Sequence, residues 1–487
     1  MLPATPLRIP SAALAALLCA GAFAATLSVG RPNPQPAEGT VIGMIDGTVG
    51  STAGGTVGGT VGAKIAAPPA SPDTGSVIFI HPDGASAATW TAARALHVGP
   101  DGDLNWDLLP AIAVYRGHMG DSLTATSNGG GTTHAFGVKV RSDAYGRTGG
   151  GATGEPILTA AGASAGVARQ AIAAGIPVGL VQTGIAPEPG SACFIADAAS
   201  RYEYDAIAAQ LIERGATVLF SGGEKHFLPR GVAGVHGPGA REDDRNLIDE
   251  ARTAGFTIVR TRAELLALPA DTERVLGLFA HDATFNAAPE EALRAAGRPL
   301  YVPGTPSVAE MTEVALRILA AKSERFMLVV EEEATDNFGN QNNAAGVLEA
   351  ARRADAAIGV AQRFLLESPQ TLVMTTADSD AGGLRMQGII HRDGGALAAV
   401  PERDFNGAPL DGVGGTGTMP FRAAPDRFGR SLAFRVHWAG RDDLSGGILV
   451  RAGGFNAHRV RGTMDNTDVA ELMRRTLFGS AMVPAQP

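Results

Sequence analysis

The fold is decided by the stretch VIFIHPD, residues 77–83, in which a short apolar run ends in Asp83. Two further runs have the same form: MLVV (327–330) before Glu331 and LVMTT (372–376) before Asp378. Such runs predict buried parallel strands, whose C-terminal ends share one edge of a sheet, the edge where open α/β sheets bind ligands. Carboxylates that meet there repel one another unless a cation neutralises them. The pattern therefore predicts a site for more than one metal ion.

The alternative is that each acid caps a helix that follows its strand, a common role of Asp and Glu. Composition does not decide between the two, but it limits the class of protein. The chain has 487 residues, of which 45% are hydrophobic and 18% charged, so it is long and apolar enough to bury a large core. Its formal net charge is −9 and it lacks a long Lys/Arg run, which argues against a nucleic-acid partner.

The N-terminus has the pattern of a secretory signal peptide over residues 1–24. Arg8 precedes an apolar stretch, 12–23, and small residues mark a cleavage site after Ala24. We therefore expect export to the periplasm or beyond the cell, with no stable membrane span after cleavage. An uncleaved anchor and lipidation at Cys19 are the alternatives.

Beyond residue 24 the chain divides into a tether and a folded domain. Residues 25–75 are rich in Gly, Pro and Ala, a composition that predicts a flexible tether. From residue 76 to 480, strand-like and helix-like segments alternate, which predicts an α/β fold: a three-layer sandwich with a mostly parallel central sheet and helices on both faces. The Gly- and Pro-rich stretch 392–434 interrupts the alternation and is interpreted as an insertion near the site.

Eight segments carry this prediction. The expected strands are 176–181, 216–221, 275–279, 326–330 and 372–376, and the expected helices are 157–174, 307–321 and 342–366.

A second constellation is TSNGGGTTHAFGVK, residues 126–139. A hydroxyl followed by small residues at the start of a helix meets free backbone N–H groups and the positive end of the helix dipole, which suit a phosphate. Ser127 is the candidate nucleophile of this segment. The alternative is an ordinary loop in which a hydroxyl residue caps a helix.

With these residues in place, the chain from about 76 to 475 resembles the alkaline phosphatase superfamily. The landmarks recur in order: IHPDG (80–84), Ser127 ten residues before GVK (137–139), LFSGGEKHF (219–227), PSVAEMT (306–312), TAD (376–378) and DNTD (465–468). The resemblance implies an alkaline phosphatase-like fold and hydrolysis of a small-molecule phosphate ester.

The resemblance also implies two catalytic residues. Ser127 matches the nucleophile, although Thr126 stands in place of the usual Asp, and the pair Asp121-Ser122 has the wrong spacing. Arg201 matches the arginine that holds two phosphate oxygens, a task suited to its planar guanidinium. The alternative for Arg201 is a surface salt bridge.

The metal ligands that the resemblance implies depart from the family pattern. They are Asp83, Ser127, Glu188, Glu331, Asp336, Asn340, Asp378, Ser379 and Asp443, with Asp442 as an alternative to the last. Asn340, Ser379 and Asp443 replace the family's three zinc-binding histidines. Oxygen ligands favour Mg²⁺ or Ca²⁺, so we expect two to three such ions, with Zn²⁺ as the family alternative. His134 and His437 are candidates to supplement the site, but a structural hydrogen-bonding role is the more common one for a single histidine.

These assignments predict an exported, metal-dependent phosphatase that hydrolyses phosphate monoesters through a phosphoserine at Ser127. A phosphodiesterase of the same superfamily is the alternative within enzymes. A non-catalytic protein that binds metal or phosphate is the alternative from another class. The resemblance leaves a homodimer open.

Overall fold

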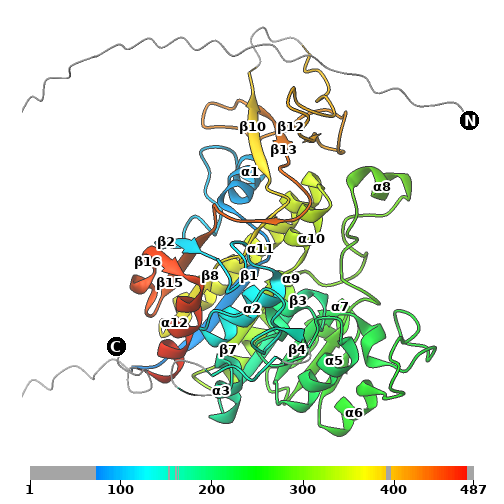
Figure 1. The fold of residues 1–487 in the computed structure, drawn as a ribbon, viewed down its shortest axis with the longest axis vertical. Coiled ribbons are helices and arrows are strands. Elements are labelled where there is room, and N and C mark those ends of the chain that lie inside the picture. The colour runs from blue at the N-terminus through cyan, green and yellow to red at the C-terminus, as the bar shows by residue number, and fades with distance from the viewer. Residues whose placement is uncertain (1–72, 152–153, 159–161, 163, 391–395, 480–487) are drawn as a thin grey trace, which may run out of the picture. The chain divides into compact units, whose positions relative to one another are not determined.

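The central element is a ten-stranded sheet with the order β16-β2-β15-β8-β1-β7-β3-β4-β6-β5 (Figure 1). The computed structural model describes residues 73–151, 154–158, 162, 164–390 and 396–479, so the predicted signal peptide and almost all of the predicted tether lie outside the described residues. Only β15 runs antiparallel to its neighbours β2 and β8, so the sheet is mostly parallel, as the sequence predicts.

The strands are short and those at the centre are fully buried. In chain order they are β1 (Ser76–Pro82), β2 (Ala111–Arg116), β3 (Val178–Ile185), β4 (Val218–Gly222), β5 (Thr257–Val259), β6 (Val275–Leu278), β7 (Met327–Glu332), β8 (Thr371–Thr375), β15 (Leu449–Gly454) and β16 (Arg461–Asp465). All five predicted strands are present, with bounds that differ by a few residues at either end.

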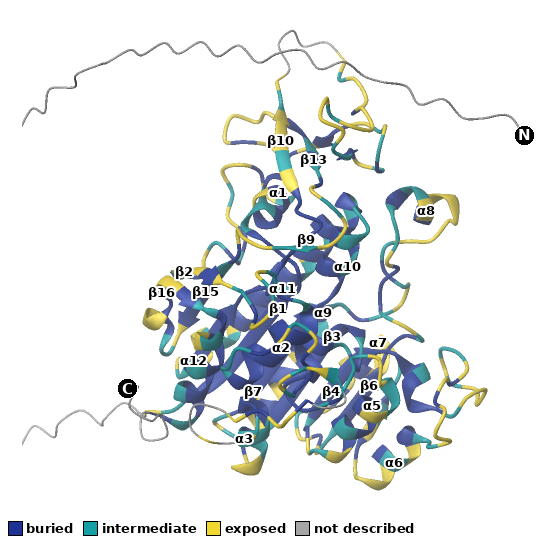
Figure 2. Cartoon of the chain, viewed as in Figure 1, coloured by how far each residue is buried: buried dark blue, intermediate teal, exposed yellow. Residues whose placement is uncertain are grey.

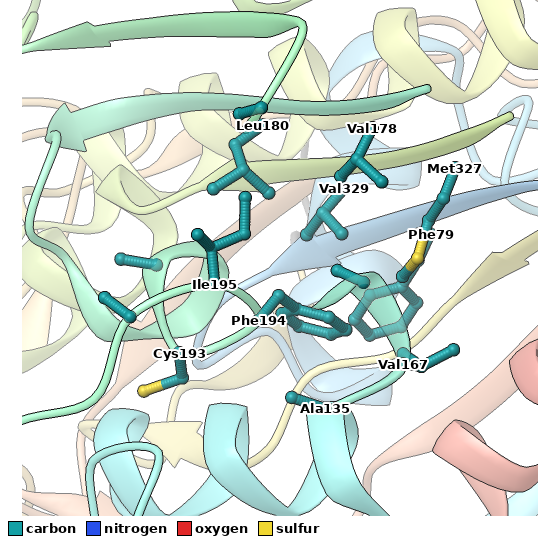
Figure 3. Close-up of a cluster of buried hydrophobic side chains, with 14 of the residues drawn as sticks. Phe79, Ala135, Val167, Val178, Leu180, Cys193, Phe194, Ile195, Met327 and Val329 are labelled. Carbon is teal, nitrogen blue, oxygen red and sulfur yellow. The ribbon is translucent and has the colours of Figure 1, made fainter. Parts of the chain in front are cut away.

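Helices cover both faces of the sheet, because successive side chains of a strand point to opposite sides. On one face, Val77 and Phe79 of β1 face a cluster that includes residues of α2, α3, α5, α6 and α12. On the other face, Ile78 and Ile80 face α1, α7, α9, α10 and α11. Figure 2 shows the resulting buried interior, and Figure 3 shows Phe79 packed beside Phe194, with Val329 of the adjacent strand nearby.

The bounds of the helices are as follows. They are α1 (Ala87–His97), α2 (Ser127–Phe136), α3 (Val167–Ala173), α4 (Pro189–Ala192), α5 (Tyr204–Glu213), α6 (Leu247–Thr253), α7 (Arg262–Leu266), α8 (Glu290–Ala295), α9 (Val308–Lys322), α10 (Ala334–Asn340), α11 (Ala344–Glu367) and α12 (Asn466–Phe478).

Two of the three predicted helices are confirmed as α9 and α11. The helix predicted over 157–174 is confirmed only from Val167. The described residues before it, among them Ile157 and Leu158, are not helical, and residues 159–161 and 163 lie outside the described residues. Gly166 is the N-cap of α3, and Gly162 has a φ of +74°, a left-handed conformation that a helix does not contain. The helical spacing of apolar residues in this stretch came mostly from alanines, whose small side chains bury little area.

The stretch interpreted as an insertion contributes to a separate small sheet. β10 (Arg385–Ile389), β11 (Leu410–Asp411) and β12 (Phe421–Arg422) each pair antiparallel with β13 (Ala433–His437). A two-stranded ribbon of β9 (Asp380–Ala381) and β14 (Asp443–Leu444) then returns the chain to the end of β8. Within the part of the chain that the structure describes, no helix is both long and apolar enough to span a membrane.

Candidate active site

Three acids come together at the C-terminal edge of the sheet. β1 lies between β7 and β8 and is parallel to both, which places Asp83, Glu331 and Asp378 at one edge. Their exposed fractions are 0%, 0% and 3%, and the carboxyl groups of Asp83 and Asp378 lie close enough to affect each other's ionisation. We call these three residues, together with His81, the strand-end group.

A second group lies on α10 and β14. The amide Nδ2 of Asn340 donates to both carboxylate oxygens of Asp336 at 3.0 Å and to Oδ1 of Asp443 at 3.1 Å. We call these three residues the α10 group. The two groups adjoin, because the Ser379 hydroxyl next to Asp378 also contacts the carboxylate of Asp443.

The pairing of β14 with β9 decides which acid joins the α10 group. Asp443 lies opposite Ala381, just beyond the end of β8, and its side chain reaches Asn340. Asp442 is exposed and contributes its backbone carbonyl to a hydrogen bond from Gly382. The structure therefore selects Asp443 over the alternative Asp442.

Ser127 is the first residue of α2 and its side chain contacts Asp83. Thr126 caps the helix by accepting a hydrogen bond from the N–H of Gly129, so the chain enters α2 with Ser127 at the buried edge of the sheet. The glycines that follow have a steric reason. A Cβ on Gly130 would lie 2.5 Å from Oδ2 of Asp378, so only glycine lets α2 approach the strand-end group this closely.

Glu188 and Arg201 form an ion pair. Nη2 of Arg201 donates to Oε1 of Glu188 at 3.1 Å, with side-chain exposures of 30% and 15%. Glu188 also contacts the side chain of Glu333, which ties the pair to the acidic cluster. Arg201 thus makes a salt bridge, the alternative that the sequence left open, at the border of the site.

Burial and mutual repulsion shift the ionisation of these acids. Burial, followed by the charge of Asp83, raises the pKa of Asp378 well above its usual value. Burial, which outweighs the attraction of His81, raises the pKa of Glu331 to about 8. Burial also favours a raised pKa at Asp83, but the attraction of His81 outweighs it, and the pKa of Asp83 is lowered.

The oxygens of the site fit divalent cations. Both carboxylate oxygens of Asp83, Glu331 and Asp378 are buried without a hydrogen-bond partner, as are Oγ of Ser379 and Oδ1 of Asn340. Unpaired buried oxygens are rare in folded proteins because each one costs free energy. So dense a set is consistent with cation ligands, and carboxylate, hydroxyl and amide oxygens are the ligands of hard cations.

Sequence reasoning missed His81 and Glu333 as members of the site. Nε2 of His81 lies 3.4 Å from Oδ1 of Asp83 and 4.0 Å from Oδ1 of Asp378, and the ring is fully buried. The signal was present, because His81 is two residues before Asp83 and side chains two apart in an extended strand share a face. Glu333 follows the end of β7 and gave no comparable signal.

The two histidines that were proposed to supplement the site have other partners. Nε2 of His134 is 2.7 Å from the hydroxyl of Tyr115. His437 lies in the small second sheet, where Nε2 is 2.7 Å from Oε1 of Gln387 and Nδ1 is 3.8 Å from Asp404. The structural interpretation therefore applies to both rings, and neither contacts a predicted metal ligand in these interactions.

The chain matches one protein family over most of its length. The profile of the family described as alkaline phosphatase matches residues 75–401. The repressible alkaline phosphatase of Saccharomyces cerevisiae is 31% identical over 338 residues, a match that spans 63% of this chain and 55%, about half, of the yeast protein. The streptomycin-6-phosphate phosphatase of Streptomyces griseus is 28% identical over 430 residues, covering 81% of this chain and 88% of that protein.

Solved structures support the same fold. Thermus thermophilus alkaline phosphatase superposes with a TM-score of 0.64 at 21% identity, over 83% of this chain and 91% of its own. The alkaline phosphatase of the Antarctic bacterium TAB5 superposes with a TM-score of 0.61 at 19% identity, over 82% and 98%, and a variant of it is described with Mg bound in its M3 site. From the family profile, which covers well over half of its residues, this chain belongs to the alkaline phosphatase family.

Proposed function

We propose that the protein is a metal-dependent phosphatase that hydrolyses phosphate monoesters through a phosphoserine at Ser127. The observation that carries the proposal is the position of Ser127 at the first turn of α2, with its side chain against Asp83 and beside a buried cluster of carboxylates. Family membership supports the reaction class.

The residues divide into three sets of ligands. We propose that Asp83, Glu331 and Asp378 hold one cation beside Ser127, and that the α10 group holds a second ion. Ser127 and Ser379 supply hydroxyl oxygens, and Glu188 with Glu333 is the carboxylate pair for a third ion. Bound cations would lower the pKa of the Ser127 hydroxyl and neutralise charge on the leaving oxygen.

The chain's own groups then perform the transfer. Oγ of Ser127 loses its proton and attacks phosphorus, a new Oγ–P bond forms, the ester P–O bond breaks, and the departing oxygen takes up a proton and leaves as the alcohol. Water attacks the phosphoserine in the second step, the Oγ–P bond breaks, one proton of the water returns to Oγ, and inorganic phosphate leaves. The N-terminal N–H groups of α2 and the Arg201 guanidinium would hold the equatorial oxygens, since phosphoryl transfer depends on positioning and electrostatics. Arg201 must then exchange part of its contact with Glu188 for the phosphate.

We propose that the leaving alcohol occupies a polar pocket of about 360 Å³ next to the α10 group. Gln341 and Asn342, which line it, directly follow Asn340, and Arg441, which also lines it, is two residues before Asp443. Its volume falls in the usual range of small-molecule sites, roughly 300–1,000 Å³. The polar lining suits an alcohol that carries hydrogen-bonding groups.

The metal identity is a separate proposal. The α10 group offers only oxygen, which favours Mg²⁺ or Ca²⁺, with Zn²⁺ as the family alternative. We further propose export to the periplasm or beyond the cell, because residues 1–24 have the composition of a signal peptide. A homodimer stays a proposal that sedimentation of the purified protein would test.

The test is hydrolysis of p-nitrophenyl phosphate by metal-stripped protein that is resupplied separately with Mg²⁺, Ca²⁺ and Zn²⁺. We expect turnover to return with a divalent ion, and bis(p-nitrophenyl) phosphate to be the poorer substrate. A diester that is hydrolysed faster than the monoester would make the protein a phosphodiesterase. Metal binding without hydrolysis of either ester would identify a binding protein instead.

A further inference from the structure

We infer that His81 is a nitrogen ligand of the metal centre, so that the strand-end group takes a transition-metal ion such as Zn²⁺ or Mn²⁺ while the α10 group remains an oxygen site. The inference rests on the proposed metal-dependent function for the location of the ions. It goes beyond that function because it assigns a ligand at a position where the family resemblance implies none, and it contradicts an oxygen-only centre.

The backbone directs the ring into the site. His81 and Asp83 are two residues apart at the end of β1, and His81 is the register partner of Glu331 in β7. A ligand atom from each of His81, Asp83 and Glu331 can be chosen so that all three lie within 4.8 Å of one another. Nε2 of His81 also lies 4.0 Å from Oδ1 of Asp378. These spacings place one nitrogen among three carboxylates.

The hydrogen bond on the other ring nitrogen fixes the tautomer. Nδ1 of His81 lies 3.1 Å from the backbone carbonyl oxygen of Thr376, which can only accept, so Nδ1 carries the hydrogen. In the neutral ring the lone pair is therefore on Nε2, which faces the acids and is buried without a hydrogen-bond partner. A backbone carbonyl on the second ring nitrogen is the usual support of a histidine that ligates a metal.

Packing holds the ring in this orientation. The ring centroid of His81 is 5.9 Å from that of Phe79 and 5.5 Å from that of His134, and its side chain has no exposed surface. An orientation that is fixed before a metal binds lowers the entropy cost of coordination. His134 provides the contrast. Its Nε2 pairs with the Tyr115 hydroxyl, and although its Nδ1 is also buried without a hydrogen-bond partner, no acid among the described residues lies within ion-pair distance of this ring, whereas His81 has two.

The resulting donor set differs from that of a hard-cation site. Imidazole nitrogen suits Zn²⁺ and other transition metals, whereas Mg²⁺ and Ca²⁺ select oxygen. One imidazole with the carboxylates of Asp83, Glu331 and Asp378 gives a mixed nitrogen and oxygen site. The α10 group has only carboxylate and amide oxygens, so the two halves of the centre differ in the ions that they favour.

The test measures metal coordination in the full chain, so that it can fail separately from catalysis. Pulsed electron paramagnetic resonance of Mn²⁺-loaded protein reports whether nitrogen is bonded directly to the ion. We expect nitrogen modulation in the wild type and in the matched variant His134→Gln, and its loss in His81→Gln. Zn²⁺ affinity, measured by competition with a chelating dye, should fall roughly 100-fold in His81→Gln, with Mg²⁺ affinity changed much less.

Two results would overturn the inference. One is wild-type Mn²⁺ protein without directly bonded nitrogen, which needs no variant and is independent of whether His81→Gln folds. The other is modulation and Zn²⁺ affinity that persist in His81→Gln, or that vanish in His134→Gln instead. Absence of phosphatase activity in all samples would refute the proposed function and leave the ligand assignment to be judged on these spectra.

Discussion

The two halves of the candidate metal centre are built on different supports. Asp83 and Asp378 follow the ends of the adjacent strands β1 and β8, and Glu331 is the second-last residue of β7. Pairing with neighbouring strands fixes the backbone of this half on both sides. Asp336, by contrast, lies on the short helix α10. Its partner Asp443 lies in β14, a two-residue strand that follows the small second sheet in the chain and pairs with β9. The first half is held by the core and the second by a few local contacts.

The difference extends to how each half balances its charge. In the strand-end group, Nε2 of His81 lies 3.4 Å from Oδ1 of Asp83, and the carboxylate oxygens lack hydrogen bonds. In the α10 group, the amide Nδ2 of Asn340 bridges two carboxylates at 3.0 to 3.1 Å. Those amide hydrogens must turn away before an ion can use both acids. We therefore expect the strand-end group to bind metal more tightly than the α10 group.

The largest effect should come from Ser127→Ala. Both halves keep their acids, so metal content should stay near the wild-type value, while removal of the nucleophile should lower kcat for p-nitrophenyl phosphate by about 10³-fold or more. Steady-state kinetics and elemental analysis on the same sample measure the two quantities. Turnover that survives the substitution would mean that water or another residue attacks phosphorus.

A second pair of variants separates the roles of the halves. Asp443→Asn should lower kcat/KM for an alkyl phosphate by roughly 100-fold and for an aryl phosphate by less, because an alkoxide leaves poorly and needs more charge stabilisation. Asp378→Asn, beside Ser127, should slow both esters to a similar degree. Equal sensitivity to the leaving group in the two variants would remove the distinction between the halves.

The pH dependence of stability tests the strand-end group without any ester. Burial raises the pKa of Glu331 from 4.5 to about 8, so the folded, metal-free protein holds a proton there that the unfolded chain has released. The free energy of unfolding should therefore fall as pH rises from about 5 to 8. The lowered pKa of Asp83 also stabilises the folded state, but this contribution is constant between about pH 5 and 8, because the carboxyl is already ionised in both the folded and the unfolded chain.

Saturation with a divalent metal should weaken this pH dependence, because the ion replaces the proton in neutralising the acids. Thermal unfolding of metal-free and metal-loaded protein across the window provides the comparison. If the thermal unfolding midpoint of the metal-free protein rises with pH, the raised pKa of Glu331 is contradicted.

The smallest effect is expected from a variant that gives the α10 group a nitrogen ligand of its own. Asn340→His replaces the bridging amide with an imidazole and should raise Zn²⁺ affinity of the α10 group by about tenfold. Calorimetric titration of Zn²⁺ resolves the weaker class of sites, with Arg363→His, at an exposed position of α11, as the control. Tighter binding in both variants would show only that an added surface histidine captures zinc.

The strands and the acids at their ends could be predicted because both depend on short stretches of sequence. The acids after apolar runs were found because strand burial and the shared edge of a parallel sheet follow from short stretches of sequence. His81 is not an acid and lies two residues before Asp83, so a pattern of acids at strand ends does not include it. Only the alternation of side chains along an extended strand indicates that it shares the face of Asp83. The helix over 157–174 was overextended because the glycines within it were given too little weight.

Other features depend on contacts between distant parts of the chain. The choice of Asp443 over Asp442 requires the pairing of β14 with β9, which no local pattern specifies. The salt bridge from Arg201 to Glu188 likewise depends on how the segment after β3 packs at the border of the site. Both become visible only once the backbone places these residues in space.

The most direct test of the two unlike halves is a crystal structure of the protein loaded with Zn²⁺ in the presence of excess Mg²⁺, with diffraction recorded on both sides of the zinc absorption edge. We predict an anomalous zinc peak at bonding distance, about 2.0 to 2.1 Å, from Nε2 of His81. We predict no zinc peak between Asp336 and Asp443. Zinc at the α10 group with none beside His81 would contradict the account.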